Sequence, residues 1–352
     1  MENLEKFIEE FQGKNILVTG GTGSIGSEIV RQLLKYNPRS VRIFARGENA
    51  HHKLRQELGL DERRTRFIIG DIRDRDKLKL AMEGANIVFH AAAMKHVDIC
   101  DNDPFEAVKT NVIGTQNIID LARYCNVDKV ISISTDKAAN PEGILGVSKL
   151  MAEKLILNSF YYRGNIPTKY TCVRFGNVLG STGSILPLLK NQIKNQSHVT
   201  ITDPEMTRFV MTIPQAVHLV LNASIMTKGQ EVFVLKMPAV RINSLFKAAI
   251  QYYAPLYNKK PSDIEIKIIG ARSGDKKHEH LLALHETDRV LEDESMFILI
   301  PRENVWGFER KETDVYKKEK TKPASKDYSS EHARKLNEEE IIELIKEIET
   351  GE

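Results

Sequence analysis

Strand-length apolar runs alternate with amphipathic stretches of helical length through the first half of this chain. Neighbouring parallel strands need a long crossover connection, usually a helix, so this alternation predicts a parallel sheet with helices on both faces. We therefore expect a doubly wound α/β fold. The predicted strands are residues 15–19, 41–45, 66–70, 87–90, 129–134 and 170–174, and the predicted helices are residues 25–35, 103–125 and 144–159.

The pattern changes after about residue 180, where short apolar runs are separated by Pro, Gly and polar residues. These runs predict a smaller mixed α/β lobe at residues 181–352, which caps the edge of the sheet domain at residues 13–180 across an interleaved boundary. Residues 311–326 are dense in charge, which predicts an exposed or poorly ordered loop. The short apolar runs lie at residues 199–201, 232–235, 264–268 and 297–300.

Both ends of the chain have the pattern of an amphipathic helix. The last helix is predicted at residues 337–348, where Asn337 and Glu340 have the spacing of a capping box. The first is short and acidic. Its predicted apolar face comprises Leu4, Phe7, Ile8 and Phe11.

The sequence TGGTGSIG, residues 19–26, directly follows the first predicted strand and opens the first long helix. Its glycines permit a tight turn and let the backbone approach a pyrophosphate, whose charge would face the helix N-terminus. A Gly-rich loop alone is a weak signal, but this strand–turn–helix context is the one that a Rossmann-type dinucleotide site requires. The predicted cofactor-binding residues here are Gly20, Thr22, Gly23, Ser24, Ile25 and Gly26.

The end of the second strand bears on the choice of dinucleotide. An NAD site usually carries an acid there, which binds the ribose 2′-hydroxyl. This chain has Arg46 instead, which suits the 2′-phosphate of NADP. We therefore expect NADP as cofactor, with NAD as the alternative because Glu48 lies close enough to reach the ribose.

The ends of the third and fourth strands complete the predicted cofactor site. Asp71 and Ile72 follow the third strand, where the adenine ring would lie, although a turn-capping aspartate is the alternative for Asp71. The small side chains after the fourth strand suit either close approach to the cofactor or plain helix packing. They are Ala91, Ala92 and Ala93.

Three proton-handling groups follow the fifth strand: Thr135, Asp136 and Lys137. Lys149 comes twelve residues later, on the next predicted helix. Ligands of open α/β sheets bind at the carboxyl ends of the strands. A hydroxyl, a carboxylate and an amine at this edge therefore predict the catalytic residues.

The overall composition limits the partners. The 51 basic and 48 acidic residues give a formal charge of +3, so no general attraction to nucleic acid or to an anionic membrane is expected. No apolar run approaches the roughly 20 residues of a membrane span, and the acidic N-terminus is unlike a signal peptide. An odd number of cysteines, three, without metal-ligand spacing is typical of a reduced compartment, so we expect a cytoplasmic protein.

The histidines do not predict a metal site. His278, His280 and His285 cluster in the sequence, but none forms an i, i+4 pair with a companion carboxylate. Hydride transfer to a dinucleotide needs no metal ion either. We expect no bound metal.

Six motifs occur in the order TGGTGSIG, HAAAMKHV, KTNVIGT, STDKAANP, GVSK and VRFGNVLGS. With them the chain resembles the extended short-chain dehydrogenase/reductases, and within that family the 4,6-dehydratases that act on UDP-N-acetylglucosamine. The similarity runs from about residue 13 to 287, with a weaker echo at residues 328–348. STDKAANP and AAAMKHV are quite specific to this group, whereas the Gly-rich loop is common to the whole superfamily.

The resemblance implies a reaction and assigns roles. Hydride leaves C4 of the sugar, the resulting ketone acidifies C5, water is eliminated across C5 and C6, and the hydride returns to C6. By resemblance, Thr135 binds the 4-hydroxyl, Asp136 is the acid for the 6-hydroxyl and Lys137 is the base at C5. Lys149 binds the nicotinamide ribose. Lys137 meets its role only if burial or a nearby cation lowers its pKa.

Position 145 departs from this pattern, because Leu145 stands where many members carry the Tyr that starts oxidation at C4. Some members with an apolar residue there are dehydratases, so the resemblance does not imply loss of activity. Asp136 or Thr135, directly or through a water, would then accept the proton of the 4-hydroxyl.

The resemblance also indicates the substrate pocket. Lys95 and His96 should lie beside the sugar, with a solvated Lys95 and a packed His96 as the alternatives. Arg208 and Arg272 come from distant segments and would converge on the diphosphate, unless they form surface salt bridges. Asn111 counts with the cofactor residues and would hold active-site backbone or water. The remaining predicted substrate residues are Asn177, Thr207 and Glu279.

The implied function is a nucleotide-sugar 4,6-dehydratase whose NADP is tightly bound and regenerated in each turnover. The alternatives are a UDP-hexosamine C4 or C5 epimerase, a dehydratase that stops at a 5,6-ene, and a cofactor-binding regulator without turnover. An epimerase does not need Asp136 together with Lys137 and usually needs the missing Tyr. A homo-oligomer, dimer or hexamer, is expected through the helices at residues 103–125 and 144–159.

Overall fold

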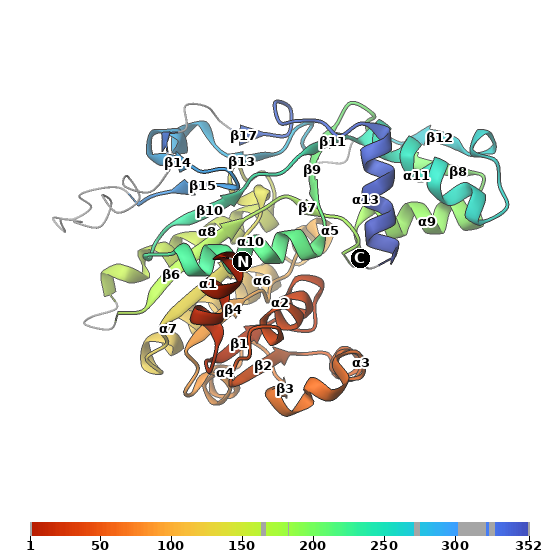
Figure 1. Ribbon diagram of the computed structural model, residues 1–352. Helices are drawn as coiled ribbons and strands as arrows, with labels where there is room; N and C mark the ends of the chain where they lie inside the picture. The colour runs from red at the N-terminus through yellow and green to blue at the C-terminus, as the bar shows by residue number, and fades with distance from the viewer. Residues whose placement is uncertain are drawn as a thin grey trace.

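One large sheet crosses the protein (Figure 1). The structure, a computed structural model, describes residues 2–162, 167–181, 183–270, 275–301, 322–323 and 328–350. The strand order is β16-β14-β15-β10-β6-β5-β4-β1-β2-β3. The parallel strands are β1 (Asn15–Thr19), β2 (Ser40–Ala45), β3 (Thr65–Ile69), β4 (Ile87–His90), β5 (Lys129–Ile133), β6 (Lys169–Arg174) and β10 (Val232–Leu235). The antiparallel strands at one edge are β15 (Met296–Leu299), β14 (Val290–Glu292) and β16 (Lys322–Pro323).

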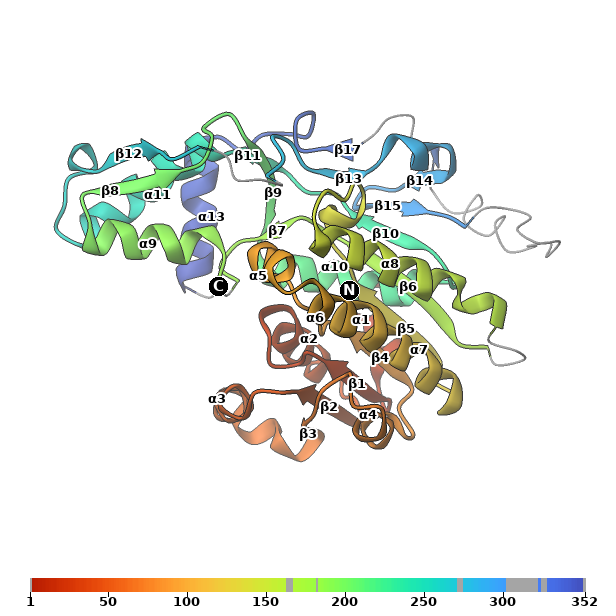
Figure 2. The same cartoon turned by 180° about the vertical axis from the view of Figure 1, so that it is seen from behind.

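Helices cover both faces of the sheet, as Figures 1 and 2 show from opposite sides. On one face α10 packs against α1 and α2, and on the other α7 packs against α4 and α8. Because helices exclude water from both faces, the central strands are continuously apolar rather than alternating. The bounds are α1 (Glu2–Phe11), α2 (Ser24–Leu34), α3 (Glu48–Leu58), α4 (Arg75–Met82), α7 (Gly114–Tyr124), α8 (Ile144–Asn158) and α10 (Ile213–Met226).

The strand order reverses between β1 and β4. From β1 the sheet continues to β2 and β3, and from β4 it continues the other way to β5, β6 and β10. The loops after β1 and β4 therefore diverge at the carboxyl edge, which is where open α/β sheets bind ligands. The doubly wound fold predicted from the sequence is confirmed, and the Gly-rich turn and the Ser134–Lys137 run both follow strands that end at this edge.

A second hydrophobic core lies beside the sheet, where α11 packs against α9 and α13. It buries Leu189, Ile193, Phe246 and Ile345, and Figure 1 shows its helices grouped at one end of the protein. A small sheet of order β11-β9-β7 and the parallel pair β8 and β12 complete this part. The bounds are β7 (Asn177–Val178), α9 (Ile185–Asn195), β8 (His198–Ile201), β9 (Thr207–Met211), β11 (Ala239–Arg241), α11 (Ile242–Leu256), β12 (Glu265–Ile268) and α13 (Glu338–Thr350).

The chain passes more than once between the two cores after residue 180. β10, β14, β15 and β16 lie beyond that point in the sequence but belong to the large sheet. The predicted division into residues 13–180 and 181–352 stays a prediction. Within the predicted loop at residues 311–326, the described residues are the two of β16, and the rest of that prediction lies outside them.

The predicted strands of the first half are confirmed to within one residue at either end. The predicted helix at residues 103–125 is instead divided into α6 (Pro104–Ala107), a π-helical turn at Val108–Ile113 and α7. It is preceded by the short α5 (Val97–Asn102). The wide turn inserts one extra residue per hydrogen-bonded ring, a feature that often marks functional sites.

The two terminal helices are present. In α13, the Glu340 backbone N–H donates to Asn337 Oδ1 at 2.8 Å and the Asn337 N–H donates to Glu340 Oε2 at 2.9 Å, so the capping box is confirmed. In α1, Phe7 and Phe11 are buried against the sheet domain. Leu4 was expected on the same face but is 54% exposed, because it lies in the first turn, beyond the surface that the helix packs on.

Candidate active site

The Gly-rich turn is closed tightly against the loop after β4. Gly20 has φ of +67°, and a Cβ there would lie 2.7 Å from the backbone nitrogen of Ala92. A Cβ on Gly26 would clash with the carbonyl oxygen of Gly20. Both positions therefore require glycine. Helix α2 begins at Ser24, directly after Gly23, so its N-terminal N–H groups face the carboxyl edge of the sheet.

A cleft of about 960 Å³ runs along this edge. Its lining brings together residues that are far apart in the sequence, and a volume of this size suits a dinucleotide and a sugar together. The predicted cofactor residues that line it are Gly20, Thr22, Gly23, Ser24, Ile25, Gly26, Arg46, Asp71, Ile72, Ala91, Ala92, Ala93 and Lys149. The other predicted residues that line it are Lys95, His96, Thr135, Lys137 and Asn177.

Arg46 lies at the rim of the cleft, with its side chain 63% exposed and its Nη1 3.9 Å from Asp71 Oδ2. Asp71 is held mainly by Arg73, which donates from Nε at 3.0 Å and from Nη2 at 2.7 Å. Partial burial favours the neutral acid, but these hydrogen bonds prevail and lower the pKa of Asp71. The carboxylate of Asp71 is thus paired with arginine side chains. Arg73 lies next to the predicted cofactor site, and the sequence patterns did not indicate it.

Asn111 is buried in the π-helical turn and positions the backbone of the next loop. Its Oδ1 accepts from the Met94 N–H at 2.8 Å, and its Nδ2 donates to the Met94 carbonyl at 3.2 Å and to Ser148 Oγ at 3.0 Å. The side-chain amide thereby fixes the chain just before Lys95 and His96. The place of Asn111 among the cofactor-site residues stays a prediction.

Lys149 points from α8 back to the end of β5, where its Nζ donates to the Ile133 carbonyl at 2.6 Å. Burial lowers its pKa. His90 lies at the end of β4 between two hydroxyls, with Nδ1 2.8 Å from Thr19 Oγ1 and Nε2 3.1 Å from Thr115 Oγ1. Burial, with the charge of Lys149, lowers the pKa of His90 to about 3, so His90 is a neutral hydrogen-bonding bridge beneath the cleft.

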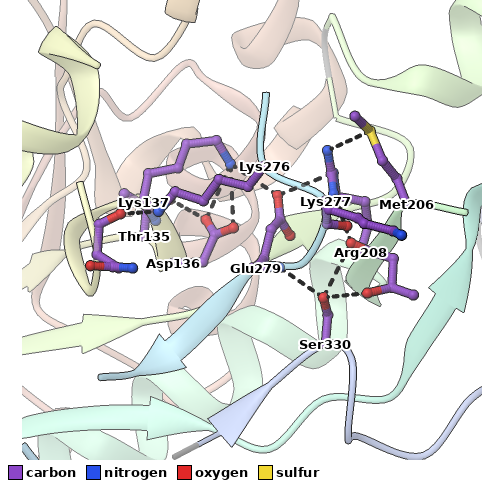
Figure 3. Close-up of polar contacts among 12 residues, drawn as sticks. Thr135, Asp136, Lys137, Met206, Arg208, Lys276, Lys277, Glu279 and Ser330 are labelled. Carbon is purple, nitrogen blue, oxygen red and sulfur yellow. Dashed lines mark hydrogen bonds and ion pairs between the residues drawn. The ribbon is translucent and has the colours of Figure 1, made fainter. Parts of the chain in front are cut away.

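The run after β5 forms a compact hydrogen-bonded cluster (Figure 3). Thr135 Oγ1 donates to Asp136 Oδ1 at 2.6 Å. Lys137 Nζ lies 3.3 Å from both carboxylate oxygens of Asp136. Burial opposes ionisation, but the ammonium of Lys137 and the donor of Thr135 lower the pKa of Asp136. Asp136 is therefore a carboxylate in this arrangement.

Glu279 comes from a distant part of the chain to the same cluster and lies between Lys137 and Arg208 (Figure 3). Its Oε1 is 3.4 Å from Lys137 Nζ and 3.4 Å from Arg208 Nε. Burial, followed by the charge of Asp136, raises the pKa of Glu279 to about 7. These residues line a second cavity of about 250 Å³, which shares Lys137, Leu145 and Asn177 with the main cleft.

Lys137 does not meet the condition set for it from the sequence. Burial does act to lower its pKa, but the adjacent Asp136 and Glu279 carboxylates outweigh burial and raise the pKa of Lys137 above the ordinary lysine value. Lys137 is thus an ammonium in this arrangement. The sequence places Asp136 beside Lys137, but it could not indicate the second carboxylate, because Glu279 lies 142 residues away.

The remaining predicted substrate residues have different surroundings. Thr207 is buried, and its hydroxyl is bonded to His278 Nδ1 at 2.8 Å and Ser330 Oγ at 2.7 Å, so it contacts neighbouring side chains rather than the cavity. Burial lowers the pKa of Lys95. His96 caps the start of α5 and lies against Gly183. Arg272 lies outside the described residues.

Leu145 lies at the start of α8 on the wall shared by both cavities. It is 5% exposed and packs in a small apolar cluster with Cys100 and Ala107. No hydroxyl is present at the position where a Tyr would have placed one. Leu145 shares the lining of the main cleft with Thr135 and that of the second cavity with Asp136.

A buried ion-pair network lies behind the cluster. Arg174, 1% exposed, donates from Nη2 to Glu153 Oε2 at 2.7 Å and from Nη1 to Glu286 Oε2 at 2.8 Å. Ser134 Oγ donates to Glu153 Oε1 at 2.5 Å. The network ties the end of β5 to α8 and to the segment that follows Glu279. The network therefore connects the segment that carries Thr135–Lys137 with the segment that carries Glu279. The sequence patterns did not indicate this network.

Among the described residues, no three His, Cys, Asp or Glu side chains gather as a metal site would require. In the same part of the chain, every helix is too short or too polar to cross a bilayer.

Comparison with known proteins identifies relatives over most of the chain. An uncharacterized membrane protein of Methanocaldococcus jannaschii is 49% identical, over 96% of this chain and 97% of its own. A UDP-glucose 4-epimerase of Rickettsia rickettsii is 37% identical, over 95% of this chain and 96% of its own. A UDP-N-acetylglucosamine 4,6-dehydratase (inverting) of Campylobacter jejuni is 38% identical, over 83% of this chain and 84% of its own.

A solved structure also matches. The X-ray structure of Pen from Bacillus thuringiensis superposes with a TM-score of 0.87 at 39% identity, covering 96% of this chain and 98% of the other. A family model described as polysaccharide biosynthesis protein matches residues 16–301. The chain therefore belongs to the polysaccharide biosynthesis protein family, within the extended short-chain dehydrogenase/reductases, a group of nucleotide-sugar dehydratases and epimerases.

Proposed function

We propose that the protein is a UDP-N-acetylglucosamine 4,6-dehydratase that works with a tightly bound NADP. The observation that carries this proposal is the Thr135–Asp136–Lys137 cluster, which opens on the same cleft as the Gly-rich turn. Elimination of water needs an acid and a base on one side of the sugar, and simple hydride transfer does not. The name of the Campylobacter jejuni relative supports the same reaction.

The residues of the cleft fit a dinucleotide. Gly20 and Gly26 pack backbone against backbone because neither has a Cβ, so the turn is free of side chains where it would face a pyrophosphate. The N-terminus of α2 offers N–H groups to the pyrophosphate charge. A bound nicotinamide would accept the hydride of C4 and return it to C6. Lys149 would hold the nicotinamide ribose, and Arg46 would bind the 2′-phosphate of NADP.

Thr135 and Asp136 take the place of the missing Tyr in the first step. The 4-hydroxyl gives its proton to Thr135 Oγ1 as Thr135 passes its own proton to Asp136 Oδ1, along the existing 2.6 Å hydrogen bond. Asp136 starts as a carboxylate, as this step requires, because Lys137 and Thr135 lower its pKa. The step ends with a neutral Asp136.

The proton gained by Asp136 is then available for the departing 6-hydroxyl. Lys137 removes the proton of C5, the C5–H electrons form the C5–C6 double bond, the C6–O bond breaks and the oxygen leaves as water with the proton of Asp136. Protonation of Asp136 also removes the charge that most strongly raises the pKa of Lys137. The first step thus prepares both groups for the second.

Residues from the second half of the chain would hold the rest of the substrate. Arg208 lines the second cavity and is oriented by hydrogen bonds from Nη1 to the carbonyls of Thr207 and Lys277, at 2.8 and 3.3 Å. We assign it, with Arg272, to the diphosphate. Asn177, which lines both cavities, is assigned to the diphosphate as well, and Lys95 and His96 would contact the sugar from the main cleft.

A UDP-sugar 4-epimerase is the second candidate, because the Rickettsia rickettsii relative carries that name. Epimerisation needs C4 oxidation and re-reduction on the other face, and it uses no acid for a leaving hydroxyl. Asp136 could still accept the proton of the 4-hydroxyl, but Lys137 would have no C5 proton to remove. This argues for the dehydratase.

Incubation of the purified protein with UDP-N-acetylglucosamine and NADP, followed by mass spectrometry, tests the proposal. The dehydratase gives a product lighter by one water, and the Asp136→Asn variant gives none. An isomer of unchanged mass would support the epimerase instead. Normal water loss by Asp136→Asn would overturn the acid role of Asp136.

We also propose a homo-oligomer. Apolar side chains are exposed on α5, α6, the π-helical turn and α8, which pack against one another. Burial of this face against a second copy would remove apolar surface from water. Sedimentation of the wild type and a Met151→Glu variant distinguishes a dimer or larger assembly from a monomer. The exposed apolar residues are Ile99, Phe105, Ile113, Val147 and Met151.

A further inference from the structure

Lys137 has two carboxylate neighbours with different surroundings. Asp136 receives hydrogen bonds from Thr135 and from Lys137. Glu279 approaches Lys137 through Oε1, at 3.4 Å, and its carboxyl group also interacts with that of Asp136. Its second oxygen, Oε2, is buried and receives no hydrogen bond from a donor among the described residues. A buried carboxylate that lacks donors is costly, so a proton that arrives on Glu279 is favoured.

The backbone and the charges around Glu279 hold it in this position. The Glu279 N–H donates to Ser330 Oγ at 2.8 Å, and Ser330 is itself bonded to Thr207. Arg208 Nε lies 3.4 Å from Glu279 Oε1. Glu279 is 6% exposed, so bulk water has little access to its carboxyl group. A charge that moves onto this group stays inside the cluster.

The proposed reaction poses a problem for Lys137 that Asp136 alone does not solve. Lys137 is an ammonium at rest, and an ammonium has no lone pair with which to remove the proton of C5. Asp136 is not available to deprotonate it, because Asp136 has just taken the proton of the 4-hydroxyl. A second acceptor within hydrogen-bond distance of Lys137 Nζ is therefore needed.

We propose that Glu279 is this acceptor: it takes one proton from Lys137, holds it while Lys137 works as a base at C5, and returns it at the end of the turnover. This inference rests on the proposed dehydratase function. Glu279 lies 3.4 Å from Lys137 Nζ and acts through it, so it is a positioning residue.

The protons balance over the cycle. The Lys137 ammonium gives a proton to the Glu279 carboxylate, which leaves a neutral amine and a neutral acid. The amine takes the C5 proton and becomes an ammonium, while Asp136 gives its proton to the 6-hydroxyl. After the hydride reaches C6, Lys137 gives a proton to C5, and Glu279 restores the ammonium. Asp136, Lys137 and Glu279 are then as they began, and one water has left.

The charges around Glu279 set the pH range of this exchange. Asp136 and Lys137 face it from the run after β5, and Arg208 faces it from β9. Burial and Asp136 raise its pKa to about 7, so the carboxylate form that accepts the proton grows as pH rises through neutrality. The remaining titratable groups that line the same cavity are Glu142, Asp275, Lys276 and His280.

The Glu279→Gln variant tests the inference, with Glu343→Gln as a control that makes the same substitution on α13, where the side chain is 71% exposed. Each protein is mixed with UDP-N-acetylglucosamine, and reduced nicotinamide absorbance, water loss and solvent deuterium uptake at C5 are followed from pH 5.5 to 9, a range of roughly two units on either side of neutrality chosen to bracket the titration. We expect Glu279→Gln to oxidise C4 and accumulate reduced nicotinamide, with water loss and C5 exchange slowed roughly 100-fold or more. Glu343→Gln should resemble the wild type.

The pH profile separates a proton-accepting role from a merely structural one. The rate of water loss by the wild type should rise with pH through about 7, and this rising limb of the pH profile should be absent in Glu279→Gln. Circular dichroism shows whether the variant is folded. Equal slowing of oxidation and water loss, or an unchanged limb in a folded variant, would overturn the inference and leave the dehydratase proposal intact. Wild-type protein that never releases water would overturn the dehydratase proposal and this inference with it.

Discussion

Thr135 donates its hydroxyl proton to the adjacent Asp136, with 2.6 Å between Oγ1 and Oδ1. The hydroxyl is oriented by this bond, its oxygen also accepts from the Lys137 backbone N–H at 3.4 Å, and Thr135 lines the main cleft. A Tyr at position 145 would make such a pair unnecessary for oxidation at C4. Leu145 offers no proton acceptor, so in the proposed reaction the Thr135–Asp136 pair starts the first step.

The first prediction concerns Thr135. Thr135→Val keeps the shape of the side chain and removes the hydroxyl, so turnover with UDP-N-acetylglucosamine should fall by roughly 100-fold or more. Thr135→Ser keeps the hydroxyl and should retain most of the rate. Stopped-flow absorbance of reduced nicotinamide measures the step directly. Equal oxidation rates for the Val and Ser variants would exclude the relay.

The second prediction concerns the Gly-rich turn. Gly26→Ala places a Cβ against the carbonyl oxygen of Gly20, where backbone has to move to admit it. Overpacking of this kind costs about 1–3 kcal/mol, and NADP affinity should fall at least tenfold because the turn that faces the pyrophosphate is displaced. Calorimetric unfolding and titration with NADP measure the two effects.

Gly47→Ala is the stability control for this variant. Gly47 has φ of −84°, and the nearest atom to an added Cβ would be Ala50 Cβ at 3.6 Å, an ordinary contact. Its unfolding temperature should match the wild type. If Gly26→Ala unfolds at the wild-type temperature and binds NADP normally, the contact between Gly26 and the Gly20 carbonyl is not needed for stability or for cofactor binding.

The sheet could be predicted because burial on both faces leaves a plain signal in the sequence. In β4, Ile87 to His90 are all buried, and the run has no polar residue until the histidine. Helix α13 was predictable from its capping residues, which act locally. The helix at residues 103–125 was not, because the π-helical turn that divides it follows from tertiary packing rather than from any local propensity.

The site was predictable in its members but not in its charges. The motifs indicate Asp136 and Lys137, which stand side by side in the sequence, but not the second carboxylate near Lys137, because Glu279 is 142 residues distant. The buried network has the same character, since Arg174 is 21 residues from Glu153 and 112 from Glu286. Sequence patterns describe neighbours along the chain, whereas electrostatic shifts come from neighbours in space.

The third prediction concerns the cofactor. Arg46→Ala should weaken NADP binding roughly 10- to 100-fold, the effect of losing one charge-assisted contact to a phosphate, and should leave NAD binding unchanged. Lys53→Ala also removes one positive charge, seven residues later on α3, where the side chain is 80% exposed, and it serves as the control. Titration calorimetry with both dinucleotides measures the ratio. Equal loss for NAD and NADP would argue against a 2′-phosphate contact.

The fourth prediction concerns the network behind the site. Arg174→Met leaves the Glu153 and Glu286 carboxylates buried without their cation, and breaking a buried pair in this way costs about 3–5 kcal/mol. Arg31→Met removes an exposed pair with Glu57 and should cost no more than about 1 kcal/mol. Urea unfolding followed by circular dichroism compares them. Similar losses in both variants would contradict the structural role of Arg174.

The last prediction uses the protonation of Glu279 as a property of the folded protein, independent of any substrate. Burial and Asp136 raise its pKa from 4.5 to about 7, so the folded state binds this proton more tightly than the unfolded state does. The stabilisation is complete below about pH 4.5 and is lost as pH rises through about 7. Between these values one proton can contribute a slope of at most about 1.4 kcal/mol per pH unit.

Glu279→Gln removes that proton equilibrium and keeps the size of the side chain. The difference in unfolding free energy between wild type and variant should therefore shift in favour of the variant as pH rises from 5 to 8, a window set around the raised pKa. The exposed control Glu343→Gln should show no such trend. Urea titrations at half-unit steps of pH measure the difference. A difference that stays constant across the window would mean that Glu279 is ionised throughout, and that its carboxylate is stabilised by Lys137 and Arg208 more strongly than burial and Asp136 oppose it.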